Sequence, residues 1–470
     1  MTGIDRLDTL RSGLMVVVSV AAIALIFGHA DWITSIGGMA LVAFLILGWR
    51  RFTVGTWVPI GLAAITLTVA LVERVPGAVL AQGIDRALFL AALMSLLGML
   101  RSAAMIAPEV EAAGKFVTGQ PASRRYLALS FGGHLFGVLI NFGGLIILLD
   151  LARNSLASAA TRSLSPALQE VRLRRMTLAV MRGFTLISLW SPFGFATNVI
   201  LITLPSLSYA DFGPIGFAAS FIFVAVGWTL DRLGHRHLAG AVPRGSTAPD
   251  GSWRGAVLLL GHVAALGGAI FVLYRLSPLN FQEALILLVP GYAVLWAALS
   301  ARGAGTGRMV ARALGDTWKR MPLAAGEIGM FAAAGFLSVV LLAVIPVEGL
   351  RAVLADAGLG ATGLIFGLAL GIVALALMGV NPIVASSVLG AIAVQLALPG
   401  VSDLGIALAI TGGWTVAIGL SPFLTTSILC AAITERPAWR IGPIWNGPYS
   451  ATILLGWGLF LGLLMLVGVI

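Results

Sequence analysis

Two Ser-Pro-Phe tripeptides lie inside long apolar stretches of the chain, where polar residues are costly. The two copies are Ser191-Pro192-Phe193 and Ser421-Pro422-Phe423. Hydroxyl or amide side chains follow each copy, namely Thr197 and Asn198 after the first and Thr425 and Thr426 after the second. A proline inside a helix frees a backbone carbonyl, and neutral oxygens can replace the hydration shell of a sodium ion in dry surroundings. The ends of a broken helix also attract anions. The pattern therefore predicts two helix breaks that bind an ion or a substrate; the alternative is a pair of simple proline kinks.

Each tripeptide is preceded by a segment that carries an asparagine at a helix-breaking position. The two segments are Asn141-Phe142-Gly143-Gly144 and Val380-Asn381-Pro382. Glycines allow the backbone to turn tightly. A proline disfavours the helical conformation of the residue before it, so Pro382 breaks a helix at Asn381. We therefore add four residues to the predicted substrate- or ion-binding site: Asn141, Gly143, Asn381 and Pro382.

Three ionisable side chains near these segments could contact a proton or an anion. His134 precedes the first asparagine and is either a proton acceptor or a packing histidine. Arg182 could attract an anion from the cytoplasm, or it could extend its side chain to the membrane surface. Glu327 begins a predicted helix, where it is either a proton carrier or a carboxylate favoured by the helix dipole.

The composition of the chain is that of a membrane protein. Of its 470 residues 59% are hydrophobic and only 10% are charged, and the mean hydropathy is +1.02. A soluble domain carries about 25% charged residues, so this chain lacks the polar surface of a water-soluble globule. Its single cysteine, Cys430, excludes an internal disulfide. We predict an all-α polytopic membrane protein, because helices satisfy their own backbone hydrogen bonds in lipid.

Basic residues determine how the apolar stretches are arranged. If 127–150 crossed the membrane once, basic residues would flank it on both sides: Lys115, Arg124 and Arg125 before it, and Arg153, Arg172 and Arg175 after it. Basic residues collect on the cytoplasmic side, so we predict that 127–150 enters and returns as a re-entrant hairpin. Segment 361–398, which is broken at Asn381-Pro382, is predicted to be a second hairpin entered from outside. About eleven spanning helices remain, and the basic segment 165–177 is expected at the inner surface.

This arrangement places the N-terminus in the cytoplasm and explains the net charge of +10. The basic residues that it leaves outside are Arg74, Arg86, Arg275 and Arg351. The remaining Lys and Arg residues lie inside, so the positive charge reflects topology and not nucleic-acid binding. The expected location is the inner (cytoplasmic) membrane of a bacterium, with the lipid bilayer as a partner.

The chain also divides into two similar parts. After an N-terminal segment and first helix at 1–31, residues 32–254 and 255–470 each contain three spans, a hairpin, a long span and a final span. Their hairpins open from opposite sides, so the repeats are inverted. Inverted repeats with broken helices at the middle of the membrane are characteristic of secondary transporters.

This layout resembles the ion transporter superfamily, and within it the divalent anion/sodium symporters, as a distant relative. The resemblance covers nearly the whole chain in architecture. It implies one hairpin from each side, an unwound long helix after each hairpin, and sodium-site ligands at the hairpin tips. Asn141 and Asn381 match those tips, although the family's typical tip reads Ser-Asn-Thr. Ser191-Pro192 and Ser421-Pro422 match the unwound helices.

The predicted function is secondary active transport: cation-coupled uptake of a small organic or inorganic anion by an elevator-type mechanism of alternating access. Sodium is the expected coupling ion, with no organic cofactor and no other metal, and a homodimer is one assembly that such a fold allows. The alternatives are a membrane-embedded enzyme of lipid or glycan metabolism, or a channel. An enzyme is disfavoured because the outer loops are short and the sequence has no His/Asp/Glu cluster with ligand spacing.

Overall fold

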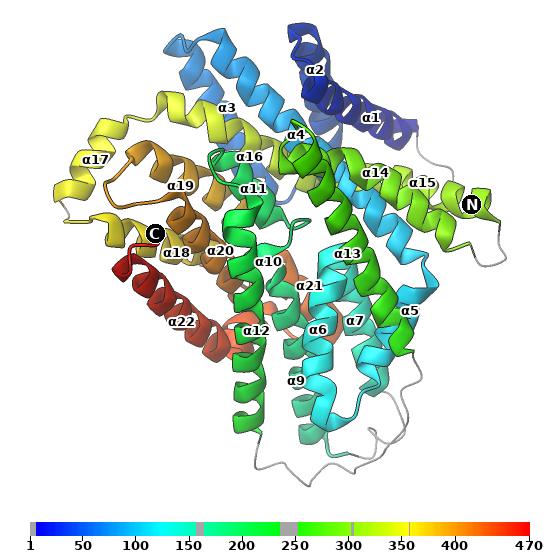
Figure 1. The fold of residues 1–470 in the computed structure, drawn as a ribbon. Helices are drawn as coiled ribbons and strands as arrows, with labels where there is room; N and C mark the ends of the chain where they lie inside the picture. Colours follow the sequence, from blue (N-terminus) through cyan, green and yellow to red (C-terminus); the bar gives the residue numbers. More distant parts are fainter. Residues whose placement is uncertain (1–5, 157–163, 236–251, 302–304, 357) are drawn as a thin grey trace.

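The computed structural model describes residues 6–156, 164–235, 252–301, 305–356 and 358–470. All regular structure in these ranges is helical (Figure 1). Within these described ranges, eleven helical stretches are long and apolar enough to cross a membrane. The prediction of an all-α polytopic membrane protein is therefore confirmed. Residues 1–5 of the predicted N-terminal segment lie outside the described ranges.

The first half of the chain forms a series of α-helices, most of them apolar. They are α1 (Arg6–Phe27), α2 (Asp31–Gly48), α3 (Val54–Val72), α4 (Gly77–Met105), α5 (Pro108–Thr118), α6 (Ala122–Ile140), α7 (Phe142–Leu156), α9 (Pro166–Thr185), α10 (Ile187–Trp190), α11 (Phe195–Thr203) and α12 (Tyr209–Gly234), with the short 3₁₀ turn η1 (Trp49–Arg51) after α2. The segment at 165–177 is part of α9, which continues without a gap into the predicted long span.

The second half has a similar order of helices. They are α13 (Trp253–Leu276), α14 (Phe281–Leu299), α15 (Thr306–Arg320), η3 (Met321–Ala324), α16 (Ala325–Val344), α17 (Val347–Asp356), α18 (Ala361–Leu377), α19 (Pro382–Leu396), α20 (Asp403–Leu420), α21 (Thr425–Thr434), the π-helical segment η4 (Arg440–Asn446) and α22 (Gly447–Leu466). The division into inverted repeats at 32–254 and 255–470 stays a prediction.

Two helix pairs correspond to the predicted hairpins. The first pair, α6 and α7, is interrupted at Asn141 alone, and the second pair, α18 and α19, at residues 378–381. The members of each pair contact one another. Neither pair belongs to the eleven candidate spans, and their re-entrant course stays a prediction.

Glycines bring each first arm against a broken long helix. A Cβ on Gly183 of α9 would collide with the backbone oxygen of Ser130 on α6, and one on Gly413 of α20 would lie 2.6 Å from the backbone oxygen of Ala369 on α18. Helices packed in lipid approach closely where such small residues meet. In Figure 1, α6, α7 and α9 lie together at the lower centre, α18 and α20 lie at the left, and α10 and α11 lie between the two groups.

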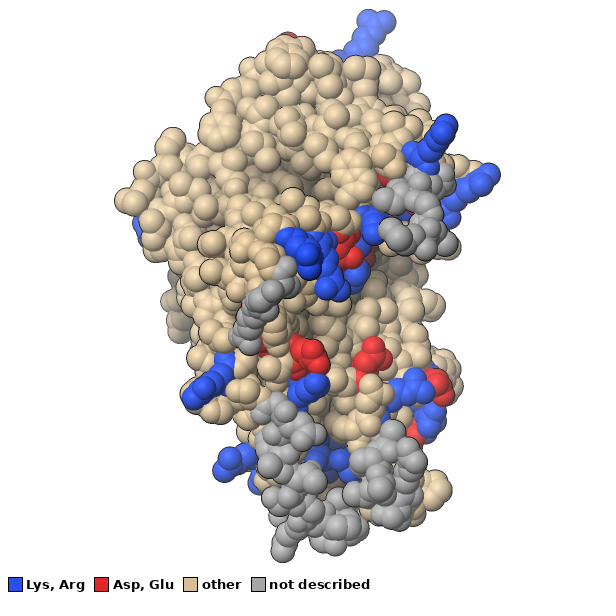
Figure 2. Space-filling view, turned by 90° about the vertical axis from the view of Figure 1, so that its right-hand side faces the viewer, with Lys and Arg blue, Asp and Glu red and all other residues tan. Residues whose placement is uncertain are grey.

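Charged side chains are unevenly distributed over the surface. Figure 2 shows most Lys, Arg, Asp and Glu side chains in the lower and middle parts of one face, whereas few interrupt the upper part. Such an uneven distribution is typical of a protein whose apolar surface faces lipid.

Candidate functional site

Both Ser-Pro-Phe tripeptides interrupt a helix, as the prolines predicted. Helix α10 ends at Trp190 and α11 begins at Phe195, while α20 ends at Leu420 and α21 begins at Thr425. Four residues are unwound at each break. The helix interruptions are therefore confirmed, whereas the role of these residues in binding stays a prediction.

The asparagines lie at the two other breaks, and each has a different local role. Asn141 adopts φ 54° and ψ −135°, a positive-φ conformation that glycine adopts freely and that is uncommon for residues with a side chain. Asn381 caps α19: its side-chain oxygen accepts a hydrogen bond from the backbone N–H of Ile383 at 2.9 Å. Pro382 occupies the first turn of that helix, where its missing N–H costs nothing.

The two asparagines border one cavity of about 70 Å³. The predicted site residues on its wall are Asn141, Asn381, Pro382, Glu327, Thr425 and Thr426. Trp414 and Phe331 supply aromatic surface on the same wall. The structure thus brings together six of the predicted residues from four separate segments of the chain.

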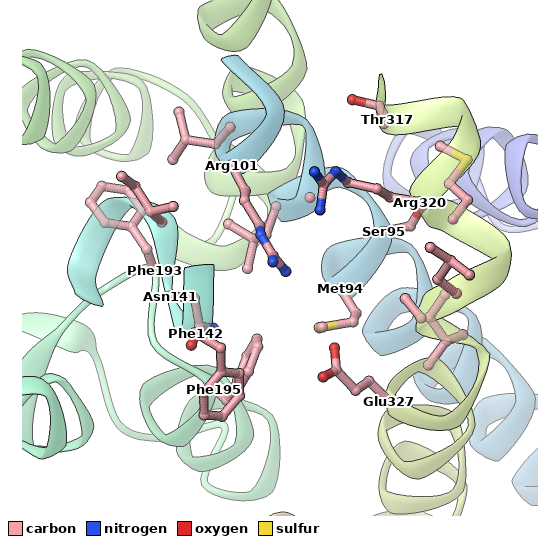
Figure 3. A pocket seen from close by; sticks show the side chains of 18 of the residues that line it. Met94, Ser95, Arg101, Asn141, Phe142, Phe193, Phe195, Thr317, Arg320 and Glu327 are labelled. Atoms are coloured by element: carbon pink, nitrogen blue, oxygen red, sulfur yellow. The ribbon is translucent and has the colours of Figure 1, made fainter. Parts of the chain in front are cut away.

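A larger cavity of about 290 Å³ lies on the other side of Asn141 and contains two facing charges. Arg101 extends into it from α4 and Glu327 from α16 (Figure 3). Arg320 lies on the same wall, but its Nε donates to Asp316 at 2.6 Å. Asn141, Phe142, Phe195 and Glu327 border both cavities. Figure 3 shows Asn141 and Phe195 on the side of the cavity opposite Arg320 and Glu327.

Arg101 is the main site residue that sequence reasoning missed. None of its guanidinium nitrogens has a hydrogen-bond partner or a salt bridge among the described residues, and its Nε is buried. An unpaired cation that is partly removed from water is a strong anion-binding group. Gly143 makes room for it, because a Cβ at that position would lie 2.8 Å from Arg101 Nε. The signal in the sequence is an arginine inside the apolar stretch that forms α4.

Several buried oxygens near the helix breaks have no hydrogen-bond partner in the part of the chain that the structure describes. In the first break they are Ser191 Oγ, Thr197 Oγ1 and Asn198 Oδ1, and near the second they are Thr426 Oγ1, Ser427 Oγ and Ser386 Oγ. Buried polar atoms are rarely left unpaired, because this costs free energy. Neutral oxygens without donors are suitable ligands for a monovalent cation.

The two serines of the tripeptides differ in this respect. Ser421 Oγ donates to the backbone oxygen of Ala376 at 2.6 Å and accepts from the N–H of Phe423 at 3.2 Å. Ser191 is fully buried and its hydroxyl has no partner. Asn198 turns its amide nitrogen to the backbone oxygens of Pro192 and Gly194, at 3.1 and 2.8 Å, which leaves Oδ1 free. Ser191, Pro192, Thr197, Asn198, Ser421 and Pro422 lie behind the cavity walls.

His134 and Arg182 lie apart from both cavities and have other partners. His134 Nε2 accepts a hydrogen bond from Trp190 Nε1 at 3.0 Å, and its Nδ1 lies 3.2 Å from the backbone oxygen of Gly183. Arg182 donates to Asn446 Oδ1 at 2.8 Å and stacks on the ring of Tyr449. These contacts connect α9 to its neighbours, so both side chains have structural roles in this conformation.

No group of three or more His, Cys, Asp or Glu residues in the described ranges could hold a metal ion. The candidate site consists of an arginine and a carboxylate on the walls of two neighbouring cavities that share four lining residues, with neutral oxygens at the helix breaks beside them. This combination can bind an anion and a monovalent cation.

The sequence matches no protein-family model and no curated protein. The fold, however, resembles solved structures. One is the crystal structure of the YdaH transporter of Alcanivorax borkumensis, with a TM-score of 0.56 and 19% identity over 81% of this chain and 85% of that one. Another is MtrF of Neisseria gonorrhoeae, described as illuminating a class of antimetabolite efflux pumps, with a TM-score of 0.46 and 15% identity over 82% and 83% of the two chains. The chain thus shares its fold with a solved membrane transporter.

Proposed function

We propose that this protein is a secondary active transporter that takes up a small anion together with a cation. The observation that carries the proposal is Arg101, an unpaired guanidinium on the wall of a cavity of about 290 Å³. The volume suits a small molecule, and apolar residues such as Met94 and Phe195 on the same wall suit an organic anion.

The cation belongs to the proposal because of the unpaired oxygens at the helix breaks. Ser191, Thr197 and Asn198 would contribute to one site, and Thr426 and Ser427 to another. These ligands are neutral, and hard cations prefer oxygen. We therefore assign sodium as the coupling ion. A cation held beside the anion would also offset part of the negative charge of the substrate.

Alternating access would be of the elevator type, with the helix pairs α6–α7 and α18–α19 moving together with the broken long helices. The glycine contacts described above support this grouping, because they join each first arm tightly to its long helix. The likeness to a solved transporter supports transport over an enzyme or a channel. The proposal also includes a distant relationship to the divalent anion/sodium symporters. It places the protein in the bacterial inner membrane with the N-terminus inside, and it takes the protein to be a homodimer.

A binding assay followed by an uptake assay tests this function. The purified protein is heated in the presence of monocarboxylates, dicarboxylates, sulfate and phosphate, each with sodium or with potassium. We expect at least one anion to raise the midpoint of thermal unfolding, and more strongly in sodium. That anion, radiolabelled, should then accumulate in proteoliposomes under an inward sodium gradient at fixed pH. Stabilisation by no anion under any condition would contradict the proposal.

Proton coupling is a second candidate, favoured by the place of Glu327 on the walls of both cavities. Protonation of Glu327 would remove its negative charge while Arg101 stays positive. The net positive charge of the pair would then favour entry of an anion. A pH gradient without sodium separates the two possibilities. Uptake that follows the pH gradient alone and is lost in Glu327→Gln would replace sodium by the proton.

A further inference from the structure

A second cluster of basic side chains lies away from both cavities, where α6, α9 and α12 meet. These three helices contact one another, and their ends lie side by side at the bottom of Figure 1. A pocket of about 70 Å³ opens between them. Its charged residues are Arg125, Arg172, Arg175 and Asp231. By the predicted topology this end of the protein faces the cytoplasm.

The single carboxylate in this pocket is already used. Arg175 donates to both oxygens of Asp231, at 2.9 and 2.7 Å, and His235 lies 3.6 Å from the same carboxylate. Among the residues that the structure describes, Arg125 and Arg172 therefore have no acidic partner. Arg125 donates from Nε to the backbone oxygen of Gln120 at 3.0 Å, whereas the Nε of Arg172 is buried without any acceptor.

The two unpaired arginines are held close together at an energetic cost. Burial lowers the pKa of Arg125 to about 10, and the positive charges of Arg172 and Arg175 act in the same direction. An anion placed among them would relieve this repulsion. The guanidinium group is well suited to phosphate, because its planar N–H groups match the phosphate oxygens.

The rest of the pocket wall is apolar. It consists of Leu129, Leu164, Leu168, Val171 and Met176, with Tyr126 beside them. A free inorganic anion gains nothing from such a surface, whereas an amphiphile gains from both parts of it. Basic pockets between membrane helices on the cytoplasmic side are known to hold anionic lipid head groups.

We propose that this pocket binds the phosphate group of an anionic phospholipid from the cytoplasmic leaflet, with Arg125 and Arg172 as the phosphate ligands. The apolar wall holds the beginning of an acyl chain. The bound lipid connects the start of the first hairpin, α6, to the long helix α9. This site is independent of the transport proposal, because it shares no residue with either cavity.

The test measures how wild type and variants of the full chain bind an anionic and a zwitterionic lipid. Wild type, the double variant Arg125→Gln/Arg172→Gln and the control Arg124→Gln are purified in the same detergent. Arg124 is exposed and next to Arg125, so the control removes the same charge from the same flank. Phosphatidylglycerol or phosphatidylcholine is added at equal mole fractions, and bound lipid is counted by native mass spectrometry while thermal unfolding is followed in parallel.

We expect phosphatidylglycerol to bind to wild type and to Arg124→Gln and to raise the midpoint of unfolding, with phosphatidylcholine much less effective. Each arginine removed from the pocket should weaken phosphatidylglycerol binding by about five-fold. A second double variant, Arg125→Lys/Arg172→Lys, keeps both charges and should retain most of the binding, which guards against misfolding of the glutamine variant.

Three results would overturn the proposal. Equal binding in wild type and in the Arg125→Gln/Arg172→Gln variant would show that the pocket is not the site. An equal loss in Arg124→Gln would show that binding follows surface charge in general. Equal stabilisation by inorganic phosphate would assign the pocket to a soluble phosphate instead of a lipid.

Discussion

Asn141 and Asn381 border the same cavity, although they lie far apart in the chain and on different helix pairs. Each stands at the point where its pair is interrupted, but Asn141 holds a positive φ while Asn381 caps a helix. Asparagine therefore holds a positive φ at one break and caps a helix at the other, while both residues border the same cavity. Substitutions can separate the backbone role from the chemical role.

We expect Asn141→Gly to fold normally and to transport poorly. Glycine adopts φ 54° without strain, so the break between α6 and α7 is preserved while the amide is lost. Asn141→Ala should unfold at a lower temperature than Asn141→Gly, because a Cβ makes a positive φ unfavourable by about 1–2 kcal/mol. Thermal unfolding and uptake are measured on the same preparations. Full transport by Asn141→Gly would mean that asparagine is needed only for the turn.

Arg101→Gln should raise the anion concentration needed for half-maximal uptake by at least ten-fold, because it removes the unpaired positive charge on the wall of the larger cavity. Gly143→Ala should do the same more weakly, since the new Cβ would lie 2.8 Å from Arg101 Nε and displace the guanidinium. Arg86→Gln, on the same helix, serves as the control. If Arg101→Gln and Gly143→Ala bind the anion as well as the Arg86→Gln control and wild type do, the anion is held elsewhere.

Much of this fold follows from the sequence, because each correct prediction depended on local chemistry. Apolar stretches must be helical in lipid, and the prolines at 192 and 422 favour a break in any helix that contains them. Proline alone is not sufficient, because Pro290 lies inside the unbroken helix α14. The position of Arg101 depended on something else. Whether an arginine of α4 faces lipid, water or a cavity is decided by how α4 packs against α16 and by the absence of a Cβ at Gly143.

The contacts of Arg182 also depend on packing, and its possible contact with an anion stays a prediction. Its partners are Asn446 and Tyr126, which come from η4 and α6. Contacts between residues so far apart cannot be deduced from spacing along one helix. The backbone next to Ser191 was predicted correctly, whereas the hydrogen-bond partners of Arg182 needed the three-dimensional structure.

The two serines of the Ser-Pro-Phe tripeptides should respond differently to alanine. Ser191→Ala removes a hydroxyl that has no partner, so the stability should change by less than about 0.5 kcal/mol, while the sodium concentration for half-maximal uptake should rise several-fold. Ser421→Ala breaks two hydrogen bonds and should cost about 1–2 kcal/mol. Unfolding midpoints and sodium titrations of uptake distinguish the two effects. An unchanged sodium dependence in Ser191→Ala would remove this oxygen from the cation site.

Labelling from the two sides of the membrane tests the predicted hairpin at 127–150. Cysteines are introduced singly at Ser123, in the first turn of α6, and at Ser155, in the last turn of α7, in a background that carries Cys430→Ser. We expect an impermeant thiol reagent to reach both only from the cytoplasmic side. Reaction from opposite sides would show that the segment spans the membrane and would remove the basis for the inverted repeats.

Glu109 connects α5 to two membrane helices, and its contribution to stability should depend on pH. Its carboxylate accepts a hydrogen bond from Trp296 Nε1 at 2.8 Å and lies 3.5 Å from His262 Nε2. Burial acts to raise its pKa, but the bonds from His262 and Trp296 outweigh burial and lower the pKa from 4.5 to about 2. The carboxylate therefore stabilises the fold fully above about pH 4.5, and this contribution is lost as the pH falls toward 2.

Glu109→Gln should accordingly be less stable than wild type by about 1.5–3 kcal/mol at pH 7, the usual contribution of hydrogen bonds to a charged group. The difference should shrink as the pH falls below 4.5, because the carboxyl of the unfolded wild-type chain then binds a proton that the folded state does not bind until about pH 2. Glu111→Gln is the matched control, since Glu111 lies on the same helix and its carboxylate is exposed beside Lys115; surface pairs of this kind contribute little. Unfolding midpoints of the three proteins between pH 7 and pH 3 provide the comparison. A difference between wild type and Glu109→Gln that stays constant over this range would show that the loss arises from packing and not from the charge of Glu109.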